Sequence, residues 1–423
     1  MTHVLRAYVA LGVLFLIGLT NYFDRVALGV LQVPIKEELQ FSDSQLGLLT
    51  GLAFFIPYTL LAIPIARIAD RSNRKYLLAA ALTVWSSMTA LISAAEGFLL
   101  ILVLRMGVAI GEATCLPTSY SLLSDYYPPE KRGRAIAIFV MSFPLGSMLG
   151  IAGAGALADR FGWRAAFVVL GGLGLVLVPM LLLLLREPPR GGFHADAAHE
   201  PTKPPPPLLD AMRMLWNRRE FRYVALGLGF QTYVATTVLS WSAPFYTRVH
   251  DLELSHAAVA LGLLTGIGGA CGSFLGGALG DRFGCRNQRW YLWVPAMACA
   301  ITALAGMCQY LVPHAMLSLV FAFATMIMVS GFVPPVYAIA QSLVAPNMRA
   351  LTSAVLVMSS ALLGGAFGPT VTGSLSDYFS HAFDAGPHSL QIAICLGFLF
   401  SVGAAWSFYR AGYELRAAPP EEI

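Results

Sequence analysis

The stretch ARIADRSNRK, residues 66–75, ends an apolar segment with one aspartate and four basic side chains. Three later stretches repeat its spacing: GALADRFGWR (155–164), GALGDRFGCR (277–286) and GSLSDYF (373–379). Each has a small residue, three intervening positions and then an aspartate. The recurrence predicts four equivalent helix ends, in a chain built from repeats of a three-helix unit.

The composition indicates that the segments between these stretches cross a membrane. Only 12% of the residues are charged and 57% are hydrophobic, whereas a soluble domain has about 25% charged residues. Apolar stretches near the ~20 residues needed to span a bilayer recur along the chain. The predicted fold is therefore an all-α membrane protein with twelve transmembrane helices, at 7–32, 44–66, 76–95, 97–122, 134–158, 165–186, 220–247, 256–280, 290–310, 314–343, 350–376 and 387–411.

One long polar interruption divides the chain into two six-helix halves. Residues 1–186 form the predicted N-terminal half, 187–219 a cytoplasmic linker and 220–423 the C-terminal half. The linker contains the run PPPP, which is stiff and extended. Its last part, LLDAMRMLW (208–216), is a candidate for a short helix lying on the membrane surface.

The basic residues indicate the orientation in the membrane. Arginine and lysine are concentrated in the linker and in the loops after the second, fourth, eighth and tenth spans. The opposite loops hold only Lys36, Arg160, Arg164 and Arg248. By the positive-inside rule both termini and the linker are cytoplasmic, which an even number of spans allows. Because the charge follows the bilayer in this way, the net charge of +4 does not indicate nucleic-acid binding.

Two motifs resemble those of a known transporter family. ARIADRSNRK resembles the signature loop between helices two and three of the major facilitator superfamily, with Ala66 and Asn73 where glycine is usual. RMGVAIGEA (105–113) resembles the fourth-helix motif of that superfamily, which carries a membrane-embedded arginine. Both fall at the expected spans, so the resemblance covers essentially the whole chain. It implies the major facilitator fold and transport by alternating access.

A narrower resemblance is to the spinster family of lysolipid and sphingolipid transporters. NYFDR (21–25), DRSNRK (70–75) and RMGVAIGEA carry it together. NYFDR alone also resembles the organic anion:cation symporters, but Glu112 and the ending Asn73-Arg74-Lys75 favour spinster. The short loops and termini favour a bacterial member. The implied location is the bacterial inner membrane, as a multi-pass protein.

Four charged side chains lie deep in the predicted spans, all in the N-terminal half: Asp24, Arg25, Arg105 and Glu112. Each costs roughly 2.5–3.5 kcal/mol at the bilayer centre, which makes a functional role the default. Asp24 and Arg105 are expected at similar depth, so that they meet if their helices are neighbours, with Glu112 about 10 Å nearer the cytoplasm. We expect Asp24 and Glu112 to carry protons and Arg105 to control their proton affinity. The alternative is a static ion pair that fixes helix packing.

The C-terminal half offers only neutral groups at depth, and this asymmetry bears on the substrate. A cavity with one charged and one mostly apolar wall suits a molecule with a polar head and a hydrocarbon tail. A small dicarboxylate would instead need cations on both sides. The predicted substrate contacts are Arg25, Arg105, Glu112, Tyr22, Phe23, Gln231, Tyr233, Trp241 and Tyr337.

The loop motif predicts a cytoplasmic gate. A carboxylate at the end of helix two can accept hydrogen bonds from the N-terminus of a neighbouring helix. In the superfamily this contact closes the cytoplasmic side, with helix eleven as the usual partner, whereas the alternative is simple charge anchoring. The predicted gate residues are Asp70, Arg71, Arg74 and Lys75, joined by Asp125 and Arg134, with Asp281 and Arg282 in the second half.

The sequence thus predicts a proton-coupled secondary transporter of a lipid-like amphiphile, and not an enzyme. No metal-ligand spacing or catalytic constellation is visible, so no cofactor is expected and the proton is the coupling ion. The expected partners are the substrate and the bilayer, and the expected state is a monomer. The alternatives are a symporter of small organic anions, a multidrug-type exporter, and a receptor or scaffold without transport, which would gain little from embedded charges.

Overall fold

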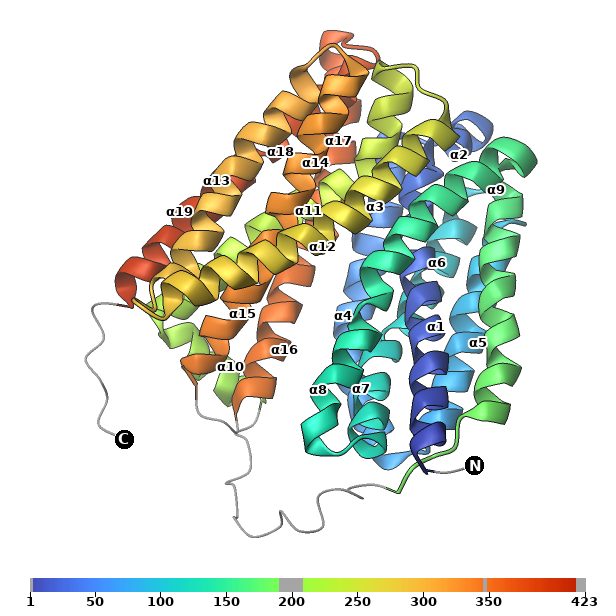
Figure 1. Ribbon diagram of the computed structural model, residues 1–423. Helices are drawn as coiled ribbons and strands as arrows, with labels where there is room; N and C mark the ends of the chain where they lie inside the picture. The colour runs from blue at the N-terminus through green and yellow to red at the C-terminus, as the bar shows by residue number, and fades with distance from the viewer. Residues whose placement is uncertain (1–2, 190–207, 345–347, 416–423) are drawn as a thin grey trace. The chain divides into compact units, whose positions relative to one another are not determined.

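The computed structural model describes residues 3–189, 208–344 and 348–415, which form helices joined by short turns (Figure 1). Within these ranges there is no strand. The prediction of an all-α protein is therefore confirmed.

The chain divides into two compact units. The first comprises Met1–Pro201 with Glu253–Gly262, and the second comprises Thr202–Leu252 with Leu263–Ile423. The predicted linker at 187–219 stays a prediction, because residues 190–207 lie outside the described ranges.

The first unit contains the helices α1 to α9 and the beginning of α12. Their bounds are α1 His3–Val30, α2 Gln32–Leu39, α3 Asp43–Thr50, α4 Leu52–Arg71, α5 Arg74–Ile92, α6 Phe98–Glu112, α7 Cys115–Tyr126, α8 Pro129–Val140 and α9 Ser142–Leu184.

The second unit contains the remaining helices, which include a short π-helix, η2. Their bounds are α10 Leu208–Asn217, α11 Arg219–Val249, α12 Leu254–Gly284, α13 Trp290–Leu311, α14 Ala315–Gly331, α15 Val333–Ser342, α16 Arg349–Ser360, η2 Ala361–Ala366, α17 Phe367–Phe383, α18 His388–Gly397 and α19 Leu399–Glu414. The predicted interfacial helix at 208–216 corresponds to α10.

Several predicted spans consist of two helices with a local break between them. Span 44–66 is interrupted at Gly51, between α3 and α4, and span 97–122 between α6 and α7. Conversely, the element α9 holds residues 142–158 of the fifth predicted span and 165–184 of the sixth, as two helical segments joined at a kink. Within it Gly162 has φ 82°, a left-handed conformation that glycine adopts without a Cβ clash.

The described ranges contain ten helical segments long and apolar enough to cross a membrane. One of them, Glu130–Leu184, has 55 residues and includes the Gly162 break. The helix α11, with 31 residues, is not among the ten. The multi-pass character is thus confirmed, while the number twelve stays a prediction.

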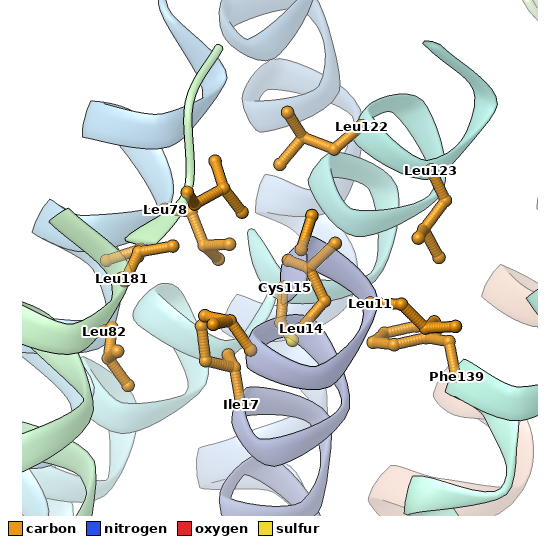
Figure 2. Close-up of a cluster of buried hydrophobic side chains, with 14 of the residues drawn as sticks. Leu11, Leu14, Ile17, Leu78, Leu82, Cys115, Leu122, Leu123, Phe139 and Leu181 are labelled. Carbon is orange, nitrogen blue, oxygen red and sulfur yellow. The ribbon is translucent and has the colours of Figure 1, made fainter. Parts of the chain in front are cut away.

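The core of the first unit is an apolar cluster to which α1 and each helix from α4 to α9 contribute. The side chains labelled in Figure 2 come from α1, α5, α7, α8 and α9 and gather in one cluster. Leu14, Ile17 and Leu82 are fully buried there, as are Leu122 and Phe139. Burying a side chain of this kind stabilises the fold by about 1.5–3 kcal/mol.

Small residues bring α1 and α9 into close contact above this cluster. A Cβ atom added at Gly146 would lie 2.6 Å from the carbonyl oxygen of Leu19, and one added at Gly150 would lie 2.9 Å from the Cα atom of Phe23. Such close backbone approach between helices is typical of small residues in membrane proteins. It fixes the part of α1 that carries the embedded charges.

Candidate functional site

The apolar cluster of the first unit is continuous with a buried polar layer. On α1, Asp24 follows Ile17 by seven residues, which is two helical turns on the same face. On α5, Thr89 follows Leu82 by the same interval. The hydroxyl of Thr89 donates a hydrogen bond to Asp24 Oδ2 at 3.3 Å. The periodicity that buries the apolar residues therefore also buries these polar ones.

The strongest contact in this layer joins Arg25 and Glu112. Arg25 Nη2 lies 3.1 Å and its Nε 3.3 Å from Glu112 Oε2. The Glu112 side chain is completely buried, and that of Arg25 is 17% exposed. Arg25 follows Asp24 directly and therefore projects about 100° around the helix from it, and its pairing with Glu112 was not predicted. The long arginine side chain makes it possible.

Three aromatic rings surround the Arg25 guanidinium. Its Cζ lies 4.7 Å from the ring centre of Tyr22, 5.1 Å from Phe54 and 4.9 Å from Tyr58. Rings within about 6 Å attract a cation through their negatively polarised faces. These contacts and Glu112 together stabilise a charge that the membrane interior would otherwise penalise. Neither Phe54 nor Tyr58 was among the predicted site residues.

Arg105 binds the backbone of α1. Its Nη1 donates to the Asp24 carbonyl oxygen at 3.2 Å, and its Nη2 to the Arg25 carbonyl oxygen at 3.1 Å. Its Cζ also lies 4.6 Å from the ring centre of Phe54. The expected proximity of Arg105 and Asp24 is present, but the hydrogen bonds go to peptide oxygens. The planar guanidinium thus holds α6 against α1 through two adjacent acceptors.

Both buried carboxylates keep one oxygen without a hydrogen-bond partner among the described residues. In Asp24 this is Oδ1, and in Glu112 it is Oε1. Asp24 is 3% exposed and Glu112 is fully buried. Leaving a buried charged oxygen unpaired is costly, and protonation lowers that cost by removing the charge. The arrangement therefore suits two groups that gain and lose a proton.

The other predicted substrate contacts of the first unit, Tyr22 and Phe23, pack against α9, and their role in substrate binding stays a prediction. Tyr22 stacks on Phe143 with ring centres 4.5 Å apart, in addition to its contact with Arg25. The backbone of Phe23 lies against Gly150. These contacts join α1 to α9 and support the charged layer from one side.

The predicted substrate contacts of the second unit are occupied by neighbours within that unit. Gln231 is fully buried, donates to Thr302 Oγ1 at 3.3 Å and accepts from the Ser401 hydroxyl at 2.5 Å. Trp241 Nε1 donates to the Pro369 carbonyl oxygen at 3.1 Å. These bonds fit a packing role for Gln231 and Trp241 better than substrate binding.

The two tyrosines predicted at the substrate site are placed differently from each other. Tyr233 is buried and stacks on Phe400, with ring centres 4.2 Å apart. Tyr337 is half-buried against the apolar cluster of the second unit. Their assignment to the substrate site stays a prediction.

Among the predicted gate residues, Arg74 is the centre of a hydrogen-bonded cluster. The side chain is 2% exposed and contacts Asp125 Oδ2 at 2.5 Å and Glu187 Oε1 at 2.7 Å. Glu187 Oε2 also accepts from the Lys75 backbone N–H at 3.0 Å. Glu187 therefore caps the N-terminus of α5, where the helix dipole favours an anion. Glu187 was not among the predicted gate residues, although it directly follows the predicted span 165–186.

The remaining gate residues are mostly exposed. The exposed group comprises Arg71, Arg134, Asp281 and Arg282, and Lys75 is half-buried. Asp281 accepts a hydrogen bond from the Tyr291 hydroxyl at 3.1 Å. The side chain of Asp70 lies outside the described part of the structure. The gating role of these residues stays a prediction.

Comparison with protein families agrees with this architecture. A family model described as Major Facilitator Superfamily matches residues 14–369. The chain belongs to the Major Facilitator Superfamily. Its embedded charges are thus those of a membrane transporter, whereas the fourth repeated aspartate, Asp377, lies inside α17 and not at the predicted helix end.

Individual relatives support the narrower resemblance. An "MFS-type efflux pump" from Mycolicibacterium smegmatis is 32% identical, over 92% of this chain and 89% of its own. Human "Protein spinster homolog 1" is 29% identical, over 88% of this chain and 73% of its own. A crystal structure is known of a bacterial homologue of the human lysosomal transporter spinster, in an inward-facing and unoccupied conformation. It is 30% identical in sequence and has a TM-score of 0.87, over 98% of this chain and 99% of that one. The predicted relationship to spinster proteins is confirmed.

Proposed function

We propose that this Major Facilitator protein is a proton-coupled transporter of an amphiphilic, lipid-like molecule. The observation that carries the proposal is the pair of buried carboxylates, Asp24 and Glu112, each with one oxygen that has no hydrogen-bond partner in the part of the chain that the structure describes. Two arginines, Arg25 and Arg105, lie in the same layer. The alternative is a static ion pair that fixes helix packing.

In the proposed cycle, protonation of Glu112 weakens its attraction to Arg25. The neutral acid no longer compensates the guanidinium charge. Arg25 is then more stable beside another anion or in a more hydrated position. The aromatic rings of Tyr22, Phe54 and Tyr58 hold the cation in the meantime. Proton binding and the conformation of α1 relative to α6 are thereby linked, because both depend on one charge pair.

The substrate class follows from the contrast between charged and neutral groups. Arg25 is 17% exposed and ringed by aromatics, which suits an anionic head group joined to an apolar chain. The described buried polar side chains of the second unit are all uncharged. A lysophospholipid fits both features, and the similarity to proteins named spinster homolog supports that choice.

A second candidate is export of an amphiphilic drug. The 32% identity to a mycobacterial efflux pump favours it. Transport of a small organic anion receives less support. Such a substrate would need cations on both sides, and the described residues of the second unit include no buried Lys or Arg.

The test uses purified protein in liposomes with a fluorescent lysophospholipid and an imposed pH gradient. We expect gradient-driven movement in the wild type and in the matched surface variant Glu130→Gln. In Asp24→Asn we expect the movement to lose its dependence on the gradient. Competition by unlabelled lysophospholipid, by a dicarboxylate and by a hydrophobic cationic drug separates the substrate classes. Unchanged gradient dependence in both Asp24→Asn and Glu112→Gln would refute the proton assignment.

A further inference from the structure

An aromatic groove runs along the outside of the second unit, between α13 and α19, which lie side by side (Figure 1). Its volume is about 500 Å³, within the roughly 300–1,000 Å³ of ordinary small-molecule sites. The walls include Trp290, Trp293, Trp406 and Tyr409, with Met297 and Ala300 deeper along α13. Three of the seven tryptophans of the chain therefore line one groove.

We propose that this groove binds one anionic phospholipid of the surrounding bilayer, with its acyl chain against the rings and its head group near Arg289. This inference is independent of the transported substrate. Tryptophan and tyrosine prefer the membrane interface because their rings are apolar and their N–H or O–H groups are polar. Basic pockets between transmembrane helices on the cytoplasmic side are suited to anionic head groups.

The charges at the mouth of the groove are those that an anionic head group requires. The Arg289 guanidinium Cζ lies 5.8 Å from the ring centre of Trp293, and Arg286 is exposed in the preceding turn. Basic residues outnumber the described acidic residues of this end: Asp281, which accepts from the Tyr291 hydroxyl, is followed directly by Arg282, and Glu414 lies 3.6 Å from Arg410. The excess of positive charge is thus available to a ligand.

The walls of the groove are held by contacts between the two helices. Trp293 and Tyr409 stack with ring centres 6.2 Å apart, and Trp290 meets Trp293 edge to face at 5.5 Å. A Cβ atom at Gly412 would lie 2.7 Å from Trp293 Nε1, so α19 approaches α13 closely at this point. The rings are therefore ordered before a lipid arrives, which lowers the entropic cost of binding.

The same face of the unit provides an internal comparison. A second groove of about 440 Å³ is lined by Leu311, Ile392, Cys395, Leu396 and other neutral residues of α13, α18 and α19. Neither an aromatic nor a charged side chain lines it. Lipid tails can fill that groove too, but it has nothing to select a head group. Selectivity for an anionic lipid is expected only at the aromatic groove.

The experiment is native mass spectrometry of the full-length protein in detergent, with phosphatidylglycerol or phosphatidylcholine added at equal concentration. We expect a 1:1 adduct at least about tenfold more abundant with phosphatidylglycerol, since a single charge-assisted contact is worth about 1.5 kcal/mol or more. Arg289→Gln should remove this preference, whereas Lys131→Gln, which deletes an exposed charge in the first unit, should keep it. Ala300→Trp, which fills the aromatic groove, should reduce the adduct, and Cys395→Trp, which fills the neutral groove, should not.

Three results would overturn the inference. One is equal binding of the two lipids by the wild type. Another is an equal loss in Arg289→Gln and Lys131→Gln, which would show that only the overall charge matters. The third is a loss in Glu112→Gln but not in Ala300→Trp, which would place the lipid at the transport site and leave the proposed function intact.

Discussion

The two units bury polar groups in different ways. In the first unit, Asp24, Arg25, Arg105 and Glu112 form a charged layer in which both carboxylates retain an unpaired oxygen. In the second unit, the described residues include no buried Asp, Glu, Lys or Arg. There the side chain of Gln231 forms hydrogen bonds with Thr302 and with Ser401 instead.

This difference separates groups that can change state from groups that hold a fold. A neutral amide or hydroxyl with its partners in place gains nothing from moving, and typically contributes about 0.5–1.5 kcal/mol per hydrogen bond. A buried acid next to an arginine has two charge states with different preferred surroundings. The first unit is therefore the expected location of the proton response, and the second is expected to be comparatively passive.

The largest expected effect comes from Glu112→Gln, because it removes the anion that compensates Arg25. Breaking a buried ion pair costs about 3–5 kcal/mol, which corresponds to at least ~100-fold in an equilibrium. We expect gradient-driven transport in liposomes to fall by about this factor. Glu130→Gln, on the exposed face of α8, is the control. Retention of more than half the wild-type rate would contradict the assignment of function to the first unit.

Arg105→Lys should have the next largest effect. A lysine keeps the charge but replaces the planar donor pair that bridges the Asp24 and Arg25 carbonyl oxygens. We expect transport to fall about tenfold, because one or two hydrogen bonds from a charged donor are lost. The measurement is the same uptake assay, with the exposed Arg160→Lys as control. Wild-type transport in Arg105→Lys would show that charge alone suffices.

Gln231→Leu tests the passive role of the second unit. The Ser401 hydroxyl and Thr302 lose their partner, so we expect stability to fall by about 1–3 kcal/mol. A lower thermal midpoint in detergent would report this, while transport per folded molecule should stay within about twofold. Gln288→Leu, at an exposed position in the turn before α13, should change neither. If transport falls more than stability, the original assignment of Gln231 to the substrate site is restored.

The smallest effect is expected from Glu187→Gln, which weakens the cluster around Arg74. Asp125 still compensates that arginine, and the amide oxygen can still accept from the N-terminus of α5. We expect about 1 kcal/mol of lost stability, in the range of a helix cap, and unchanged transport. A transport defect as deep as that of Glu112→Gln would extend the coupling network to this end of the unit.

Much of the fold could be predicted because membrane solvation acts on each segment separately. A stretch of about 20 apolar residues must be helical wherever it lies, since lipid offers no hydrogen bonds to the backbone. The breaks at Gly51 and Gly162 were less predictable, because they depend on how neighbouring segments pack. The same reasoning explains why Asp24 and Glu112 were correctly expected in a buried location.

The partners of those charges could not be predicted in the same way. Helical periodicity gives the direction of a Cβ atom, but a long arginine side chain can reach across a turn, so the pair of Arg25 and Glu112 was missed. Thr89, Phe54 and Tyr58 contribute to the site only because α4 and α5 pack against α1 and α6. Glu187 acts on Arg74 from more than a hundred residues away.

The sequence by itself determined that this chain crosses a membrane many times, belongs with secondary transporters and concentrates its costly charges in its first half. These properties follow from the transfer free energies of single side chains and from local periodicity. Only the tertiary structure decided which arginine meets which carboxylate and which oxygens remain unpaired. Hydrogen bonds and ion pairs act over about 3 Å, so they depend on contacts between helices that are distant in the sequence.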